Sequence, residues 1–325
     1  MTLIQNLVSR VKKKIRISRI DEKETGFRIT TSTCPDDLVR SVQSLGMIHL
    51  PILFQKKSGF QILSGFKRIE ACRRLGITEI NALILDPGTP EKSRAILAIS
   101  DNSFQRELNL IETSRALNLL SRYFPNPEAL SGAASGLRLP EHPVMISKLR
   151  KLSHLPEPVQ DAVGAGAISL PVALALFELD PETAIPIATL FCELKLGFNQ
   201  QRELMLLFEE IAFREQISLL DLVFDATLQK IRTDPDMDGN LKIRQIKAAL
   251  MKRRFPYKTS MEEEFQLLVK KMKLGRGVLI KPSREFEAGN YSLTLEFEDM
   301  DSLKRYHEVL DKITGSLEFK RFIET

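Results

Sequence analysis

The chain has 325 residues, of which 43% are hydrophobic and 27% are charged, and its net charge at neutral pH is +5. This composition indicates a globular protein with two or three domains, and no apolar run is long enough to predict a membrane span. The three cysteines are scattered and odd in number, which argues against a disulfide framework and a zinc site. We therefore expect a cytoplasmic protein with no membrane partner.

The positive charge is concentrated in the N-terminal part of the chain. Cations clearly outnumber acids in residues 1–125, whereas the two nearly balance in residues 126–255 and 256–325. A second, local cluster of cations lies at Lys242–Lys258. Such asymmetry is compatible with a polyanionic partner, although a charged surface that only promotes solubility is the alternative.

Strand and helix patterns alternate over residues 1–125 and predict an α/β domain. Apolar segments indicate strands, glycine and proline mark turns, and capping or acidic residues mark helix starts. Asn109 and Glu112, for example, have the spacing of a capping box. The expected elements are short strands around Ile15–Ile20 and Phe27–Ile29, a helix from Pro35 to Gly46, a hairpin in "PILFQKKSGFQIL", a helix from about Lys67 to Leu75, a strand in "EINALIL", and helices that begin at Thr89–Glu91 and Asn109.

Residues 126–255 have helical periodicity and predict an all-helical middle domain. Between two of its helices, "DPDMDGNLKIRQ" starts like a calcium loop, but Gln245 stands where that loop requires a bidentate glutamate. An acidic turn is the expected structure there. After one short helix in "FPNPEALSGAASGLRLPEHP", helices are expected at 142–152, 157–164, 169–179, 182–192, 199–215, 218–231 and 241–254, with a further helix at 260–273 in the C-terminal part.

Residues 256–325 predict a small β-β-α module. "GVLIKP" and "YSLTLEFE" alternate as strands, and "MDSLKRYHEVLDKI" has apolar residues on one helical face. A unit of this size does not bury a sufficient core alone. Pairing with a second copy is the simplest remedy, so we expect a homodimer through this module.

A glycine and two cations lie at a predicted strand-to-helix junction in "ILSGFKRIEACRRLGI". A phosphate site needs backbone N–H groups at a helix start, a glycine that permits close approach, and cations within reach. Ser64, Gly65, Lys67 and Arg68 supply these elements. A tight turn followed by a solvated basic helix face is the alternative.

The stretch "DNSFQREL" places a carboxylate and an amide side by side. Asp101 and Asn102 lie where one predicted helix ends, and oxygen donors of this kind suit Mg²⁺ that is shared with a nucleotide phosphate. An Asp-Asn pair is also a common turn former, so the turn alone is the alternative.

Taken together, the two stretches and "DDLVRSVQSLGMIHLPIL" resemble the N-terminal domain of ParB-type (ParB/RepB) chromosome and plasmid partition proteins, a fold shared with sulfiredoxin. In that family "G-E-R-R-x-R-A" and "E-N-x-x-R" motifs form a CTP pocket with Mg²⁺. The resemblance implies CTP and Mg²⁺ as cofactors, and Asp101 and Asn102 as metal ligands. The nucleotide-binding residues that it implies are Ser64, Gly65, Lys67, Arg68, Asn102, Gln105 and Arg106.

The chain departs from the family motifs at three positions. Phe66 replaces an acid, Glu70 replaces an arginine, and Gln105 replaces the arginine of the second motif, with Arg106 one residue later. The sulfiredoxin cysteine also corresponds to Phe66, so redox chemistry is not predicted. The anion at position 70 is expected to weaken triphosphate binding.

The predicted DNA-reading element is the helix near His142–Leu152, which resembles the second helix of a helix-turn-helix. The preceding segment "PEALSGAASGLRL" is an unusual first helix, with two glycines and a long turn. A recognition helix offers donors to bases and cations to phosphates. The candidates are Ser147, Lys148, Arg150 and Lys151. An ordinary amphipathic helix is the alternative.

A second candidate DNA contact is the basic run in "LKIRQIKAALMKRRFPYK". It ends in Lys252, Arg253 and Arg254, and no acid occurs between Asp238 and Glu262. Several cations along one helix can neutralise several phosphates. A solvated helix face is the competing interpretation.

The expected architecture is an α+β multidomain protein. A ParB/sulfiredoxin-like α/β domain covers 1–125, an all-helical helix-turn-helix domain covers 126–255, and a β-β-α dimerisation module covers 256–325. The final segment "LLVKKMKLGRGVLIKP…YSLTLEFEDMDSLKRYHEVL" resembles the dimerisation module of the same family.

Three functions remain open at this point. The first is a ParB-like protein that binds double-stranded DNA on the nucleoid in partition or DNA regulation, as a CTP-gated clamp that can recruit a partition ATPase. The second is an enzyme, either a weak CTP hydrolase or a nuclease that acts through Asp101, and no further catalytic residue is assigned. The third is an assembly protein with a vestigial nucleotide site.

Overall fold

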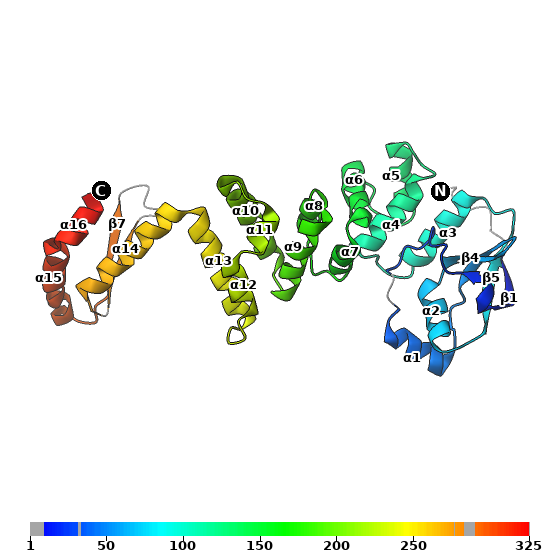
Figure 1. Ribbon diagram of the computed structural model, residues 1–325, viewed down its shortest axis with the longest axis horizontal. Helices are drawn as coiled ribbons and strands as arrows, with labels where there is room; N and C mark the ends of the chain where they lie inside the picture. The colour runs from blue at the N-terminus through cyan, green and yellow to red at the C-terminus, as the bar shows by residue number, and fades with distance from the viewer. Residues whose placement is uncertain (1–9, 32–33, 276, 283–289, 325) are drawn as a thin grey trace. The chain divides into compact units, whose positions relative to one another are not determined.

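The computed structural model describes residues 10–31, 34–275, 277–282 and 290–324. The chain divides into two compact units, Met1–Met205 and Leu206–Thr325 (Figure 1). The predicted division into three domains is not tested by this partition and stays a prediction. Within the described ranges, no helix is both long enough and apolar enough to cross a bilayer.

The first unit begins with a five-stranded mixed sheet in the order β1-β5-β3-β4-β2. β1 runs antiparallel to β5, β3 is antiparallel to β4 and parallel to β5, and β2 is parallel to β4. β1 and β2 are therefore the edge strands. The bounds are β1 (Arg10–Arg16), β2 (Ile20–Asp21), β3 (Ile52–Lys56), β4 (Gly59–Ser64) and β5 (Glu79–Leu85).

Four helices accompany this sheet, and each of them lies where the sequence predicted a helix. One face of the sheet packs against α1 and α2 in a core that contains Ile15, Ile80, Val42 and Ile69. The capping box of Asn109 and Glu112 opens α4. The predicted α/β pattern is thus present. The helices are α1 (Asp36–Leu45), α2 (Phe66–Arg74), α3 (Glu91–Ser103) and α4 (Leu110–Ser121).

One predicted strand is wrong. Phe27 and Ile29 are buried, with 4% and 2% of their surface exposed, but the segment is not a strand. The Arg28 N–H donates to the Thr25 carbonyl at 2.8 Å and closes a turn. A short apolar run can be buried in a loop as well as in a β-sheet, so the apolar pattern alone was not enough to predict a strand here.

The rest of the first unit is helical, as predicted. α6 packs on α4, where Ser114 Oγ and Asn118 Nδ2 donate to the Arg150 carbonyl at 3.3 and 2.8 Å. α10 contains the boundary between the units. The bounds are α5 (Pro127–Ser135), α6 (Pro143–Lys151), α7 (Glu157–Gly164), α8 (Leu170–Phe177), α9 (Pro181–Glu193) and α10 (Phe198–Glu215).

The helix expected at 218–231 is two helices, α11 (Leu219–Val223) and α12 (Ala226–Thr233). The break occurs because Asp225 caps the second helix and accepts the N–H groups of Thr227 and Leu228. The acidic stretch that follows is a turn, since Asp238 accepts the Leu241 N–H at 2.7 Å and caps α13 (Gly239–Arg254).

The C-terminal module holds the two predicted strands, β6 (Val278–Pro282) and β7 (Tyr291–Leu295), as an antiparallel pair. The helices are α14 (Pro256–Met272), α15 (Met300–Gly315) and α16 (Leu317–Glu324). α16 was not predicted, although it places Phe319 and Phe322 against Phe265 of α14, with ring centroids 6.2 and 5.7 Å apart. Dimerisation through this module stays a prediction.

Candidate functional site

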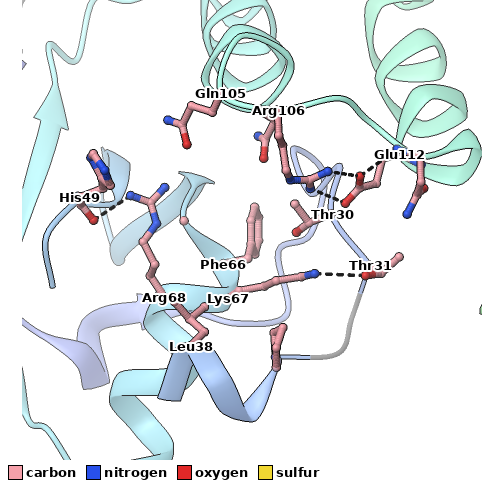
Figure 2. Close-up of a pocket in the computed structure, with 14 residues that line it drawn as sticks. Thr30, Thr31, Leu38, His49, Phe66, Lys67, Arg68, Gln105, Arg106 and Glu112 are labelled. Atoms are coloured by element: carbon pink, nitrogen blue, oxygen red, sulfur yellow. Dashed lines mark hydrogen bonds and ion pairs between the residues drawn. The ribbon is translucent and has the colours of Figure 1, made fainter. Parts of the chain in front are cut away.

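A cavity of about 510 Å³ lies at the start of α2, in the first unit (Figure 2). It brings together the two sequence stretches that predicted a phosphate site. Six of the predicted nucleotide-binding residues line it: Gly65, Lys67, Arg68, Asn102, Gln105 and Arg106. Residues from 65–68 and from 102–106 thus converge on one space, although more than thirty positions separate the two segments in the sequence.

Gly65 adopts the left-handed conformation, with φ of 95°, immediately before α2. A Cβ atom at this position would lie 2.8 Å from Cβ of Pro51, which is a clash with a rigid ring. The glycine is therefore required by backbone conformation and packing, independently of any ligand. Among the described residues no side chain caps α2, and the Arg68 N–H donates to the Gly65 carbonyl at 3.0 Å, so the N–H groups of Phe66 and Lys67 are the ones that an anion in the cavity can use.

Arg68 is a fixed positive charge at one side of the cavity. Its guanidinium donates to the carbonyls of His49 at 2.7 Å and Leu50 at 3.2 Å, and lies 3.5 Å from Asp101 Oδ2. Burial lowers the pKa of Arg68, and the charge of Asp101 opposes that shift. The guanidinium is therefore held in one geometry beside the cavity, and Asp101 offsets part of its charge.

Lys67 lies at the other side, with Phe66 between the two cationic groups in Figure 2. Lys67 Nζ donates to Thr31 Oγ1 at 3.2 Å. Burial lowers the pKa of Lys67, and the carboxylate of Glu112 partly offsets this effect. Phe66 is 9% exposed and belongs to the core beneath the cavity, so the position of the family's acid is apolar here.

Arg106 and Glu112 form a forked ion pair in the cavity wall. Nη1 lies 2.7 Å from Oε2 and Nη2 lies 2.6 Å from Oε1. Glu112 is 2% exposed and also accepts the Asn109 N–H at 3.2 Å. Burial raises the pKa of Glu112, but the hydrogen bonds from Arg106 and Asn109 outweigh it, so the pKa lies below its ordinary value. The charge of Arg106 is consequently compensated within the protein.

Asp101 and Ser64 are not among the described residues that line the cavity. Asp101 is held by three neighbours: Ser64 Oγ donates to Oδ2, Gln105 Nε2 donates to Oδ1 at 3.1 Å, and Arg68 lies 3.5 Å from Oδ2. The Asn102 amide donates to the Ala98 carbonyl at 2.8 Å. With both oxygens partnered and a cation beside them, this carboxylate does not fit Mg²⁺ in the arrangement seen, and metal ligation stays a prediction.

Glu70 lies outside the set of described residues that line the cavity, and its carboxylate is 3.6 Å from Arg74 Nε on the same helix. Sequence reasoning missed Thr30, Thr31 and His49 as lining residues. No local pattern marks them, because they reach the cavity only through the fold. The capping box predicted a helix start at Asn109, but not that Glu112 would reach the cavity.

The candidate DNA-reading helix is present as α6, with His142 at its N-cap. Ser147 and Lys148 are exposed. Arg150 is half-buried and its Nε donates to Asn118 Oδ1 at 2.8 Å, while Lys151 Nζ lies 2.7 Å from Glu178 Oε1. Of the four predicted residues, two face solvent and two hold α6 to neighbouring helices.

The exposed surface of α6 also includes two apolar side chains that sequence reasoning did not select. Val144 and Met145 are 57% and 39% exposed. Such side chains can contact thymine methyl groups, whereas Ser147 can bond to bases or phosphates. An ordinary amphipathic helix exposes a similar mixture, so the reading of DNA by α6 stays a prediction.

The basic run at the end of α13 is paired with acids inside the second unit. Lys252 Nζ lies 2.8 Å from Glu263, Arg253 lies 2.5 Å from Glu215 and 3.0 Å from Asp225, and Arg254 lies 2.7 Å from Glu210. The role of these three cations as DNA contacts stays a prediction. Their placement favours a structural role that ties α13 to α10 and α14.

No protein-family model matches the chain. A probable chromosome-partitioning protein ParB of Mycobacterium leprae is 28% identical over 193 residues, which are 57% of this chain and 56% of that protein. A nucleoid occlusion protein of Oceanobacillus iheyensis is 30% identical over 166 residues, which are 50% of this chain and 55% of that protein. The chain thus spans about half the length of the curated relatives it matches.

These relatives confirm the resemblance to ParB-type proteins that the motifs indicate. Among solved structures, the C-terminally truncated ParB from Caulobacter crescentus in complex with CTP-gamma-S is 16% identical and covers 56% of this chain and 98% of that chain. Its TM-score is 0.26, which is too low to carry an argument about this chain.

Proposed function

We propose that the chain is a ParB-like DNA-binding protein that acts in chromosome or plasmid partition or in related DNA regulation. The curated relatives support the class. The observation that carries the proposal is the convergence of Lys67 and Arg68 with Asn102 and Arg106 on one cavity. Such convergence is expected of a nucleotide site and is not needed for a solvated basic helix face.

The cavity would hold the phosphates of a nucleotide against the start of α2. Backbone N–H groups of the first turn and the fixed guanidinium of Arg68 would bind phosphate oxygens, and Lys67 would add a second charge. CTP is the nucleotide that the resemblance implies. The resemblance also implies Mg²⁺, but Ser64, Gln105 and Arg68 occupy both oxygens of Asp101, so the proposal does not depend on a metal at this carboxylate.

Double-stranded DNA would bind at α6, through Ser147 and Lys148 with support from Arg150 and Lys151. Closure of a clamp by CTP, dimerisation through the C-terminal module, recruitment of a partition ATPase and residence on the nucleoid belong to the same proposal. They rest on the resemblance alone.

A second candidate is an assembly protein whose nucleotide site is vestigial. One observation favours it: both Asp101 and Arg106 are hydrogen-bonded to protein groups, and Gln105 occupies the arginine position of the second motif. A CTP hydrolase or nuclease would need Asp101 to be available to metal or water.

Calorimetric titration of the full chain with CTP, with and without Mg²⁺ and duplex DNA, tests the proposal. Saturable CTP binding that is lost in Arg68→Gln and kept in the control Arg40→Gln is the expected result. If the chain binds duplex DNA but does not bind CTP, the result would indicate a DNA-binding protein whose nucleotide site is vestigial. Release of phosphate or nicking of DNA that disappears in Asp101→Ala would instead identify an enzyme.

A further inference from the structure

The edge strand β1 carries an unusual density of positive charge. Five of its seven residues are cationic, and every residue except Ile15 is exposed. Side chains alternate between the two faces of a strand. Arg10, Lys12, Lys14 and Arg16 therefore lie on one face, and we call this row the β1 stripe.

Only one end of the β1 stripe is neutralised. Opposite it on β5 stand Leu85, Leu83, Asn81 and Glu79, in that order. Lys14 lies 2.8 Å and Arg16 3.8 Å from Glu79, yet their side chains remain 67% and 76% exposed. Within the part of the chain that the structure describes, Arg10 and Lys12 have no ion pair.

The spacing of the stripe suits an extended polyanion. Alternate residues of a strand lie about 6.5 to 7 Å apart, so the four cations span about 20 Å. A DNA duplex carries about one phosphate per 1.7 Å, or about a dozen over that length. Exposed lysines and arginines without base-reading side chains are suited to phosphate contacts that do not depend on sequence.

An acidic peptide that adds a strand beside β1, the outer strand of the described sheet, is a different partner. Recognition of that kind uses pockets for alternate side chains, and the only apolar side chain exposed on β1 is Val11, at 53%. The β1 stripe offers positive charge but no pockets for side chains, which favours the phosphate backbone of DNA over a peptide as its partner. Lysines on an edge strand also keep it from pairing with the strands of other chains. Such protection is the third possible role of the stripe, and the test below distinguishes it from the other two.

We propose that the β1 stripe is a second DNA contact, which binds the phosphate backbone of duplex DNA independently of its sequence. The inference rests on the proposed function, because it assumes that the chain binds DNA. It adds a contact on the sheet domain that is separate from α6 and from the nucleotide cavity.

The test measures duplex binding by the full chain across a salt series, using fluorescence anisotropy and a labelled duplex of arbitrary sequence. The variant Arg10→Gln/Lys12→Gln removes the two cations without ion pairs. Each lost phosphate contact lowers the salt slope by about 0.9, so the slope should fall by about 2 and Kd should rise roughly tenfold or more at about 0.1 M salt. Circular dichroism and thermal unfolding check that the variant is folded.

Two controls accompany that variant. Lys23→Gln/Lys57→Gln removes the same charge from exposed positions outside β1 and should leave the slope unchanged. Arg10→Lys/Lys12→Arg keeps the charge and should keep the affinity.

The outcomes separate this inference from the proposed function. If the unsubstituted chain binds no duplex, the proposed function is overturned and the stripe contact with it. If Lys148→Ala weakens binding and the stripe variant does not, only the stripe contact is overturned. Two further results would also overturn the stripe contact. If the stripe variant keeps its salt slope but no longer binds labelled polyglutamate, the stripe binds an acidic peptide. If the variant keeps its salt slope and self-associates in light scattering, the stripe protects the edge strand.

Discussion

Arg106 and Glu112 hold each other through two short hydrogen bonds, of 2.7 and 2.6 Å, in the wall of the cavity. The same carboxylate completes the capping box at the start of α4. A ligand phosphate that draws Arg106 away would weaken that cap. Because α4 also supports α6 through Ser114 and Asn118, the cavity and the candidate DNA helix share one structural element.

The substitution Glu112→Gln should destabilise the protein. It removes the forked pair, and the neutral amide would leave part of the Arg106 guanidinium uncompensated, so we expect a loss of about 2 to 3 kcal/mol in the free energy of unfolding. Urea denaturation measures it. The neighbouring Glu107→Gln, at an exposed position, is the control and should change stability by no more than about 0.5 kcal/mol.

The stability that Glu112 contributes depends on pH in a defined direction. Because its pKa is lowered in the folded state, the contribution is present in full above the ordinary glutamate value of about 4.3 and is lost as the pH falls through the lowered value. Melting temperatures measured from neutral pH into this acidic range should fall more steeply for the unsubstituted protein than for Glu112→Gln. Parallel curves would contradict the assignment.

Gly65→Ala should destabilise the protein even when no nucleotide is present. The left-handed backbone and the clash with Pro51 together predict a loss of about 1 to 3 kcal/mol. Gly26→Ala is the matched control, since a Cβ there meets no atom within 4 Å. If Gly65→Ala changed nucleotide affinity but not thermal stability, the packing explanation for this glycine would be wrong.

Gln105→Arg should strengthen nucleotide binding. It places a cation in the wall of the cavity at the position where the family motif has its arginine, without removing Arg106 from Glu112. One added charge-assisted hydrogen bond is worth about 1.5 to 3 kcal/mol, which is roughly a tenfold or greater fall in Kd for CTP. Gln43→Arg, on an exposed position of α1 outside the cavity, supplies the same charge and should have little effect in the same calorimetric titration.

Lys148→Ala and Arg253→Gln should affect different properties. Lys148 is exposed on α6, so its loss should weaken DNA binding and leave stability nearly unchanged. Arg253 joins Glu215 and Asp225 with partial exposure, so its loss should cost about 1 kcal/mol of stability and leave DNA affinity intact. Fluorescence anisotropy measures the DNA affinity of both variants, and thermal unfolding measures their stability. Lower stability in Lys148→Ala together with weaker DNA binding in Arg253→Gln would contradict the prediction.

Most of the first sheet could be predicted from the sequence, because local signals agree with the fold. The hairpin of β3 and β4, the glycine before α2 and the capping box of α4 all lie where the pattern placed them. The segment at Phe27 and the short α16 were missed, since burial in a loop and packing of a short terminal helix are decided by distant residues.

The site was predictable only in part, for a similar reason. Motif spacing indicated which residues gather around the cavity. It did not show that Arg106 would pair with Glu112, that Asp101 would be held by Ser64 and Gln105, or that acids would neutralise the cations at the end of α13. These partners come from other elements, so a linear pattern of charges overestimates the charge that is free.

The aromatic contacts between α14 and α16 have a consequence inside a cell. Phe265 packs against two tilted rings that α16 supplies, so a chain that lacks α16 would present an uncovered aromatic surface. Quality-control proteases and chaperones bind such surfaces, and the shortened product would be degraded or would aggregate. Loss of α16 would thus act through protein abundance, even though it leaves the cavity and α6 untouched.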